Sequence, residues 1–177
     1  MLRWLIRLVV LAAIVVVGGA YLLPSSATFK REATIAAPPA KIYALISNYK
    51  RFNEWSPWFE RDPAAKYTFS GAETGVGAKM AWSSDKSDVG KGTQEIVAAI
   101  PDKSLDVKMD FGAMGFSKAN FVLEPAADGK STKVTWGFQT DLGMNPIARW
   151  MGLVMDRMVG PDYEKGLAKL KVAAEKP

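Results

Sequence analysis

The pattern of hydrophobic and polar positions begins with an apolar leader at the N-terminus. Uncharged residues run from Leu8 to Leu23, and an apolar extension back to Trp4 is interrupted only by Arg7. With this extension, the run comes close to the roughly 20 residues that a helix needs to cross a bilayer. Residues 4–23 are therefore predicted to lie in a membrane.

The charges around this run predict its orientation. Arg3 and Arg7 occupy its start, and the bias of positive charge toward the cytoplasm predicts a cytoplasmic N-terminus and an exported remainder. A cleaved signal peptide fits the same pattern, because small residues follow at positions 25–27. Residues 1–27 are thus read as a membrane anchor or a signal peptide. Residues 28–177 then form a domain that faces the periplasm or another extracytoplasmic side, or that is secreted if the leader is cleaved.

Beyond the leader, turn signals divide the chain into short runs with recognisable periods. The segment from Thr28 alternates and predicts a strand, which Pro38-Pro39 closes. The next run, residues 40–55, repeats apolar side chains at helical spacing and predicts a helix. Later runs alternate with period two and predict half-buried antiparallel strands, at residues 79–82, 105–111, 116–124 and 132–140.

The chain ends in a long helical pattern from Pro146 to about Ala174. Asn145 is suited to cap its first turn, with proline at the first helical position. Gly160-Pro161 predicts a kink or an interruption, after which Asp162 is placed to cap a restart. One apolar sheet face and one long amphipathic helix together predict an α+β fold, in which a strongly curved antiparallel sheet wraps the helix.

The composition removes several kinds of chemistry. The 177 residues include no cysteine and no histidine, which excludes thiolate nucleophiles, disulfides, Ser-His-Asp catalysis and metal sites built on these ligands. No cofactor or metal is expected, and any catalysis would rest on carboxylate, Lys, Tyr, Arg or hydroxyl groups. The net charge of +5 is scattered without a basic stripe, so nucleic-acid binding is not expected.

Large aromatic and methionine side chains recur at positions expected to face the interior. The stretch NEWSPWFERDP places Trp55, Trp58 and Phe59 within five residues, at a bend made by Ser56-Pro57. Such side chains either fill a core or line an apolar cavity, because methionine and broad aromatic faces serve both purposes. The inward strand positions hold Met80, Trp82, Met109, Phe111, Phe121, Trp136 and Phe138, and the long helix offers Trp150, Met151, Met155 and Met158.

Several segments resemble the polyketide cyclase/START-like (SRPBCC, helix-grip) superfamily, in particular its small membrane-anchored bacterial members. The resemblance covers nearly the whole chain. It lies in the leader ending in LLPSS, the segment REATIAAPPAKIYALISNYKRFNEWSPW, the hairpin pair GVGAKMAW and VGKGTQEI, and the helix MDRMVGPDYEKGLAKLK. The proline pair followed by the Asn-x-Trp-Ser-Pro-Trp bend is its most specific part.

This resemblance implies a seven-stranded antiparallel sheet that grips the C-terminal helix. Between them it implies a tunnel for a lipid, sterol-like, polyketide or other apolar molecule. Arg149, near the start of the helix, is expected to approach the tunnel mouth. The positions that match the tunnel region of the family are Trp55, Trp58, Trp82, Phe111, Phe121, Trp136, Met151 and Met155.

Three functions remain open at this point. The first is a non-catalytic, membrane-tethered domain that binds or carries a hydrophobic small molecule or lipid, which predicts an apolar cavity without converging ionisable groups. The second is a cyclase or dehydratase using carboxylate, Tyr or Arg groups, although the lack of histidine departs from the catalytic branches of the family. The third is an envelope protein-interaction module, which predicts a filled core and an exposed apolar patch. The pattern leaves the oligomeric state undetermined.

Overall fold

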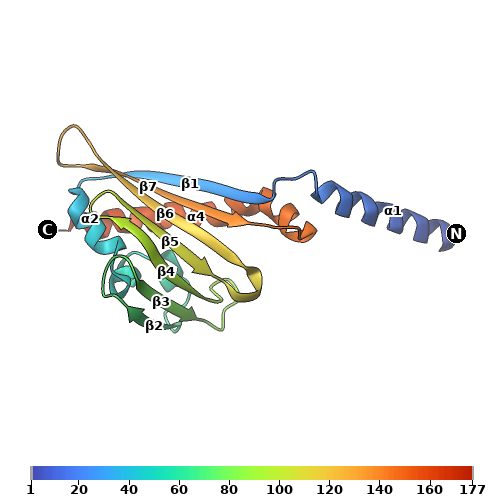
Figure 1. Ribbon diagram of the computed structural model, residues 1–177, viewed down its shortest axis with the longest axis horizontal. Coiled ribbons are helices and arrows are strands. Elements are labelled where there is room, and N and C mark those ends of the chain that lie inside the picture. Colours follow the sequence, from blue (N-terminus) through green and yellow to red (C-terminus); the bar gives the residue numbers. More distant parts are fainter. Residues whose placement is uncertain (1, 177) are drawn as a thin grey trace.

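Seven antiparallel strands form one sheet that lies against a long helix, which confirms the expected α+β helix-grip fold (Figure 1). The computed structural model describes residues 2–176. The strand order is β1-β7-β6-β5-β4-β3-β2, so each strand from β2 to β7 pairs with the next along the chain and β1 pairs with β7. The strands are β1 (Ser26–Ile35), β2 (Lys66–Gly71), β3 (Ala78–Ser83), β4 (Lys91–Ile100), β5 (Ser104–Asp110), β6 (Phe116–Pro125) and β7 (Thr132–Asp141).

The alternating residues of the strands produce one buried face. Phe121 of β6 lies opposite Trp136 of β7 in the register, and both are buried, as are their neighbours two positions along, Leu123 and Val134. The predicted run 105–111 ends one residue early, because the chain turns into the short 3₁₀ helix η2 (Gly112–Met114). Phe111 therefore caps η2 and does not continue β5.

Helix α4 (Pro146–Glu175) covers the buried face. Its first turn is capped by Asn145, whose side-chain oxygen accepts hydrogen bonds from the backbone N–H groups of the second and third following residues. The expected interruption at Gly160-Pro161 is wrong, because the helix continues through Pro161. Tyr163, Leu167 and Leu170 in the following turns are buried, and their burial outweighs the ~3 kcal/mol that a proline costs inside a helix. Asp162 pairs with Arg61 and caps no restart.

The predicted helix over residues 40–55 is two shorter elements. Helix α2 (Pro39–Ile46) stops, and Asn48 then starts the 3₁₀ helix η1 (Tyr49–Glu54) by accepting a hydrogen bond from Lys50 N. Ser56 caps the next short helix, α3 (Pro57–Arg61), with proline at its first position. The Ser-Pro pair thus turns the chain toward α4 and β2, as its sequence suggests.

Helix α1 (Leu2–Ala20) extends away from the sheet at the far end of the long axis of the molecule (Figure 1). It is long and apolar enough to cross a membrane, and within its apolar stretch no residue is buried against the rest of the chain. A signal sequence near an N-terminus has the same properties.

Candidate functional site

Aromatic side chains from four elements meet between the sheet and α4. Phe121 and Trp136 are stacked, with ring centroids 5.0 Å apart, because they are direct partners across β6 and β7. Trp55 follows η1 and packs edge-on against both rings, at 5.9 and 5.4 Å. Tyr163 of α4 lies on the other side of Trp136, with a centroid distance of 3.9 Å.

The bend in NEWSPWFERDP brings its two indoles to this cluster. The Trp55 indole N–H donates a hydrogen bond to the carbonyl oxygen of Leu45 at 3.4 Å, which ties the bend to α2. Trp58, on the first turn of α3, packs edge-on against Trp136 at 6.1 Å and against Tyr163 at 6.2 Å. The two indoles therefore contact the sheet and α4 through other aromatic rings.

A small cavity of about 40 Å³ remains inside this cluster. It has room for a few water molecules and is far below the ~300–1,000 Å³ of a typical ligand pocket. The sheet and α4 thus enclose a nearly filled core in this conformation. The lining residues are Ile46, Tyr49, Phe52, Trp55, Trp58, Gln94, Val107, Met109, Ala119, Phe121, Trp136 and Tyr163.

Two residues that line the cavity each have a buried polar atom without a partner. Among the described residues, the Tyr49 hydroxyl and the Trp136 indole N–H are buried without a hydrogen bond. Burial raises the pKa of the Tyr49 hydroxyl, and the Glu95 carboxylate adds to the rise. Burial also raises the pKa of Tyr163, with a further contribution from Asp162. Both phenols are therefore neutral, and the cavity wall offers hydrogen-bond donors and no fixed charge.

The structure brings together four of the nine residues named from the sequence, Trp55, Trp58, Phe121 and Trp136, around this cavity. Trp82 and Phe111 pack against each other, 5.7 Å apart, and lie outside its lining. The Trp82 indole N–H is already bonded to the carbonyl oxygen of Val89. These two side chains extend the core toward β3.

The remaining three residues lie on α4, outside the cavity lining. Met155 is half-buried against the core, whereas 44% of Met151 is exposed, because the first turns of α4 reach beyond the core. Arg149 is buried, but it faces the chain that follows α1. Its guanidinium donates to the carbonyl oxygens of Gly143, at 2.9 Å, and of Leu23, at 3.3 Å.

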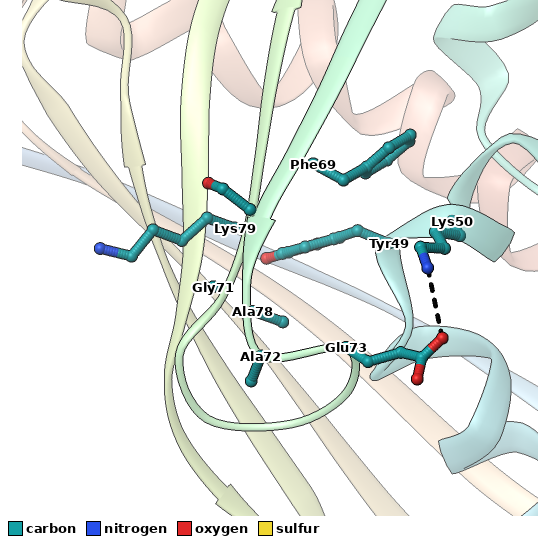
Figure 2. A pocket seen from close by; sticks show the side chains of 9 residues that line it. Tyr49, Lys50, Phe69, Gly71, Ala72, Glu73, Ala78 and Lys79 are labelled. Atoms are coloured by element: carbon teal, nitrogen blue, oxygen red, sulfur yellow. Dashed lines mark hydrogen bonds and ion pairs between the residues drawn. The ribbon is translucent and has the colours of Figure 1, made fainter.

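A larger surface groove, of about 270 Å³, lies between η1 and the β2–β3 hairpin (Figure 2). The sequence pattern did not single out this groove. Figure 2 shows Tyr49 reaching across toward β3, with the Lys50–Glu73 ion pair beside it at 3.2 Å. Of the described lining residues, only Tyr49 belongs to both the groove and the inner cavity. Tyr49 therefore lies in the walls of both the groove and the aromatic cavity.

In the sequence, this groove is indicated only by the glycines of the β2–β3 turn. Gly71 and Gly77 have positive φ angles and form the tight β2–β3 turn, in which a side chain on Gly71 would collide with the carbonyl oxygen of Gly77. The Gly75 N–H donates to the carbonyl oxygen of Ser47 at 3.0 Å, which holds the hairpin against the end of α2. This long-range contact places Tyr49 beside β3.

Comparison with solved structures shows the same fold in proteins of low sequence identity. Norcoclaurine synthase from Thalictrum flavum superposes with a TM-score of 0.62 at 15% identity, covering 86% of this chain and 96% of that one. Protein CV1439 from Chromobacterium violaceum gives 0.60 at 15%, covering 85% and 99%. Protein MLL2253 from Mesorhizobium loti gives 0.56 at 22%, covering 82% and 95%. A comparison with curated proteins gave no match.

A family model gives a more specific assignment than these superpositions. The model described as "Polyketide cyclase / dehydrase and lipid transport" matches residues 26–175, which is the entire sheet and α4. This agrees with the helix-grip architecture and with the resemblance seen in the sequence. The chain therefore belongs to the polyketide cyclase/dehydrase and lipid transport family, within the START-like superfamily.

Proposed function

We propose that residues 28–177 bind a hydrophobic small molecule or lipid between the sheet and α4, and that α1 tethers this domain to the extracytoplasmic side of a membrane. The observation that carries the proposal is the aromatic cavity, whose lining includes two residues, Tyr49 and Trp136, with buried polar atoms that lack partners. Buried polar groups are almost always paired, so an unpaired donor in a cavity wall indicates that water or a ligand supplies the acceptor. The family description, which includes lipid transport, supports the same function.

The size of the cavity sets a condition on binding. An apolar ligand with more than a few heavy atoms enters only if the aromatic side chains around Trp136 move apart. Each 100 Å² of apolar ligand surface that is then buried contributes ~2.5 kcal/mol to the affinity. Tyr49 lines both the cavity and the surface groove, so rotation of its side chain would connect the two.

The chemistry of the wall favours binding over catalysis. The cavity-lining residues include no carboxylate, lysine or arginine, and the pKa values of the two lining phenols are raised by burial. General acid-base catalysis needs a group whose pKa lies near the working pH, and a neutral tyrosine with a raised pKa is a poor base. A cyclase or dehydratase reaction that uses a carboxylate or an arginine would need a charged group that this wall lacks.

The hydrogen-bond donors of the cavity-lining residues also favour a particular kind of ligand. A hydrocarbon leaves the Trp136 N–H unpaired, whereas a ligand with a carbonyl or ether oxygen satisfies it. Leaving a buried donor unpaired costs about 1–3 kcal/mol, which corresponds to roughly 5- to 150-fold in affinity. The preferred ligand is therefore an oxygen-bearing apolar molecule.

Native mass spectrometry of the full chain, released from detergent micelles, tests this function. We expect a 1:1 adduct with 2-tetradecanone that exceeds the adduct with tetradecane, a molecule of equal chain length without the carbonyl. Trp136→Phe should reduce the preference for the ketone. Trp82→Phe is the matched control, because its indole N–H is already bonded to Val89 outside the cavity. Absence of both adducts, and of any co-purified ligand, would refute the binding function.

A further inference from the structure

The end of the domain from which α1 departs exposes large apolar side chains. Met114 is 77% exposed and Ile147 is 74% exposed. Soluble surfaces rarely gather such side chains unless they meet a partner or a membrane. We call this set the anchor-side patch: Met114, Phe116, Met144, Ile147, Trp150 and Met151.

The strand register places the members of the patch at one end of the sheet. Phe116 begins β6, and its carbonyl oxygen accepts a hydrogen bond from the Thr140 hydroxyl near the end of β7. Ser26, at the start of β1, pairs with Asp141 at that same end. The β5–β6 turn, the start of α4 and the end of α1 therefore lie at the end of the domain that faces α1 (Figure 1).

Specific bonds hold α1 against this end. The Trp150 indole N–H donates to the carbonyl oxygen of Val16 in α1 at 3.0 Å, and the Tyr21 hydroxyl donates to the carbonyl oxygen of Met144 at 3.3 Å. Arg149 donates to the carbonyl oxygens of Tyr21 and Leu23, just beyond α1, and its guanidinium lies over the Tyr21 ring. Trp150 is thus level with the last turn of α1.

The length of α1 shows where Trp150 would lie relative to a bilayer. Its 19 residues rise ~28 Å at 1.5 Å per residue, close to the ~30 Å hydrocarbon thickness of a membrane. An α1 that spans the membrane therefore ends at the boundary between acyl chains and headgroups. Trp150, which contacts Val16 one turn before that end, then lies at the interface that tryptophan favours.

The charges beside the patch fit a lipid surface. The Lys108 ammonium lies 4.7 Å from the centre of the Phe116 ring. Lys118 is directly opposite Lys108 across β5 and β6, and within residues 2–176 neither lysine forms an ion pair. Like charges opposite each other repel. Glu95 of β4 lies opposite Lys108 on its other side, and anionic headgroups next to Lys118 would relieve the remaining repulsion.

We infer that the anchor-side patch inserts into the headgroup and acyl boundary of the bilayer, so that the domain stands end-on against the membrane that α1 crosses. This inference rests on the proposed tether. It adds a lipid-contacting surface on the folded domain, at the start of α4 and the β5–β6 turn. The docked domain then holds its gripped helix end-on to the lipid, a position suited to exchange of an apolar ligand with the bilayer.

Site-directed labelling tests the docking in the full chain. The sequence has no cysteine, so single-cysteine variants carry one label each. Met114→Cys and Ile147→Cys probe the patch, and Val10→Cys probes the middle of α1. Ile100→Cys and Val172→Cys are matched controls, because these residues are apolar, 57% and 64% exposed, and at the opposite end of the sheet and of α4. Each variant is labelled with an NBD fluorophore and reconstituted into phosphatidylcholine/phosphatidylglycerol vesicles.

Brominated lipid and aqueous iodide then distinguish the outcomes. We expect brominated lipid to quench the labels at 10, 114 and 147 at least twofold more than those at 100 and 172, which iodide quenches. If positions 114 and 147 behave like 100 and 172 while position 10 is quenched by lipid, the docking fails and the tether stands. If iodide reaches position 10, the tether itself fails. Labels at 114 and 147 that are shielded from both quenchers would show a protein partner on the patch, and would overturn the lipid assignment.

Discussion

Substitution of Gly166 tests how tightly α4 packs on the aromatic cluster. A Cβ atom at Gly166 would lie 2.6 Å from Trp136 Cζ3 and 3.4 Å from Pro57 Cδ. The indole of Trp136 must therefore retreat by about 0.8 Å to restore an ordinary 3.4 Å contact. Four aromatic rings, those of Trp55, Trp58, Phe121 and Tyr163, already pack against it. The space left for this movement is the cavity of about 40 Å³.

The expected magnitude follows from two opposing effects. Overpacking of a core costs ~1–3 kcal/mol, while replacing glycine by alanine inside a helix gains ~1 kcal/mol. Gly152→Ala is a matched control on α4, because its new methyl group meets the far end of the flexible Leu142 side chain. The helix gain is common to both variants, so Gly166→Ala should be less stable than Gly152→Ala by about 2 kcal/mol. At this chain length the difference corresponds to ~4–8 °C in Tm.

Thermal unfolding of the full chain in detergent, followed by circular dichroism, measures this difference. The retreat of Trp136 also shrinks the cavity, so Gly166→Ala should bind 2-tetradecanone more weakly than Gly152→Ala does. Equal Tm values for the two variants would show that α4 does not press on Trp136. A lower Tm with unchanged ketone binding would separate the packing from the proposed ligand site, and would count against the cavity as that site.

Two further substitutions test the contacts that hold α1 and α3 against the rest of the domain. Arg149→Met keeps the apolar stem of Arg149 but removes its bonds to the carbonyl oxygens of Gly143, Tyr21 and Leu23, so urea unfolding should show a loss of about 1.5–3 kcal/mol. An unchanged urea midpoint would mean that this guanidinium does not hold α1 to the domain. Glu60 accepts from Lys165 and Lys169 on α4, and these bonds lower the pKa of its carboxyl to about 2. Its contribution is complete above the ordinary pKa of a glutamate and is lost as the pH falls toward 2. Glu60→Gln should therefore lower Tm at pH 7 and match the parent chain near pH 2, and a constant Tm difference across that range would contradict the pairing.

The sequence indicated which aromatic residues line the candidate site, but not how far the site extends along α4. Large rings at inward strand positions, or at a Ser-Pro bend after a helix, are expected to pack in the core. This expectation identified four residues of the wall: Trp55, Trp58, Phe121 and Trp136. Met151 followed the same helical pattern, yet it is exposed. Periodicity shows which side of a helix is apolar, but not how far along the helix the sheet extends.

The role of Tyr49 could not be predicted for a related reason. The helical pattern marks it as a core residue, and it is indeed buried. Its position in the wall shared by the groove and the cavity depends on the β2–β3 hairpin, which the Gly75–Ser47 hydrogen bond holds against α2. The glycines indicate a turn, but nothing local in the sequence shows that this turn contacts α2.

The sequence by itself determined the fold class and most of the local elements of this protein, although not the break between α2 and η1. Alternation with period two specifies strands with one buried face, and the 3.6-residue period specifies α4. The missing histidine and cysteine exclude whole classes of chemistry. Only the tertiary structure decided that the helix continues through Pro161, because burial of Tyr163 and Leu167 outweighs the local cost of proline. It also decided that the core is nearly filled, because the volume left between two packed layers depends on how all their side chains interlock.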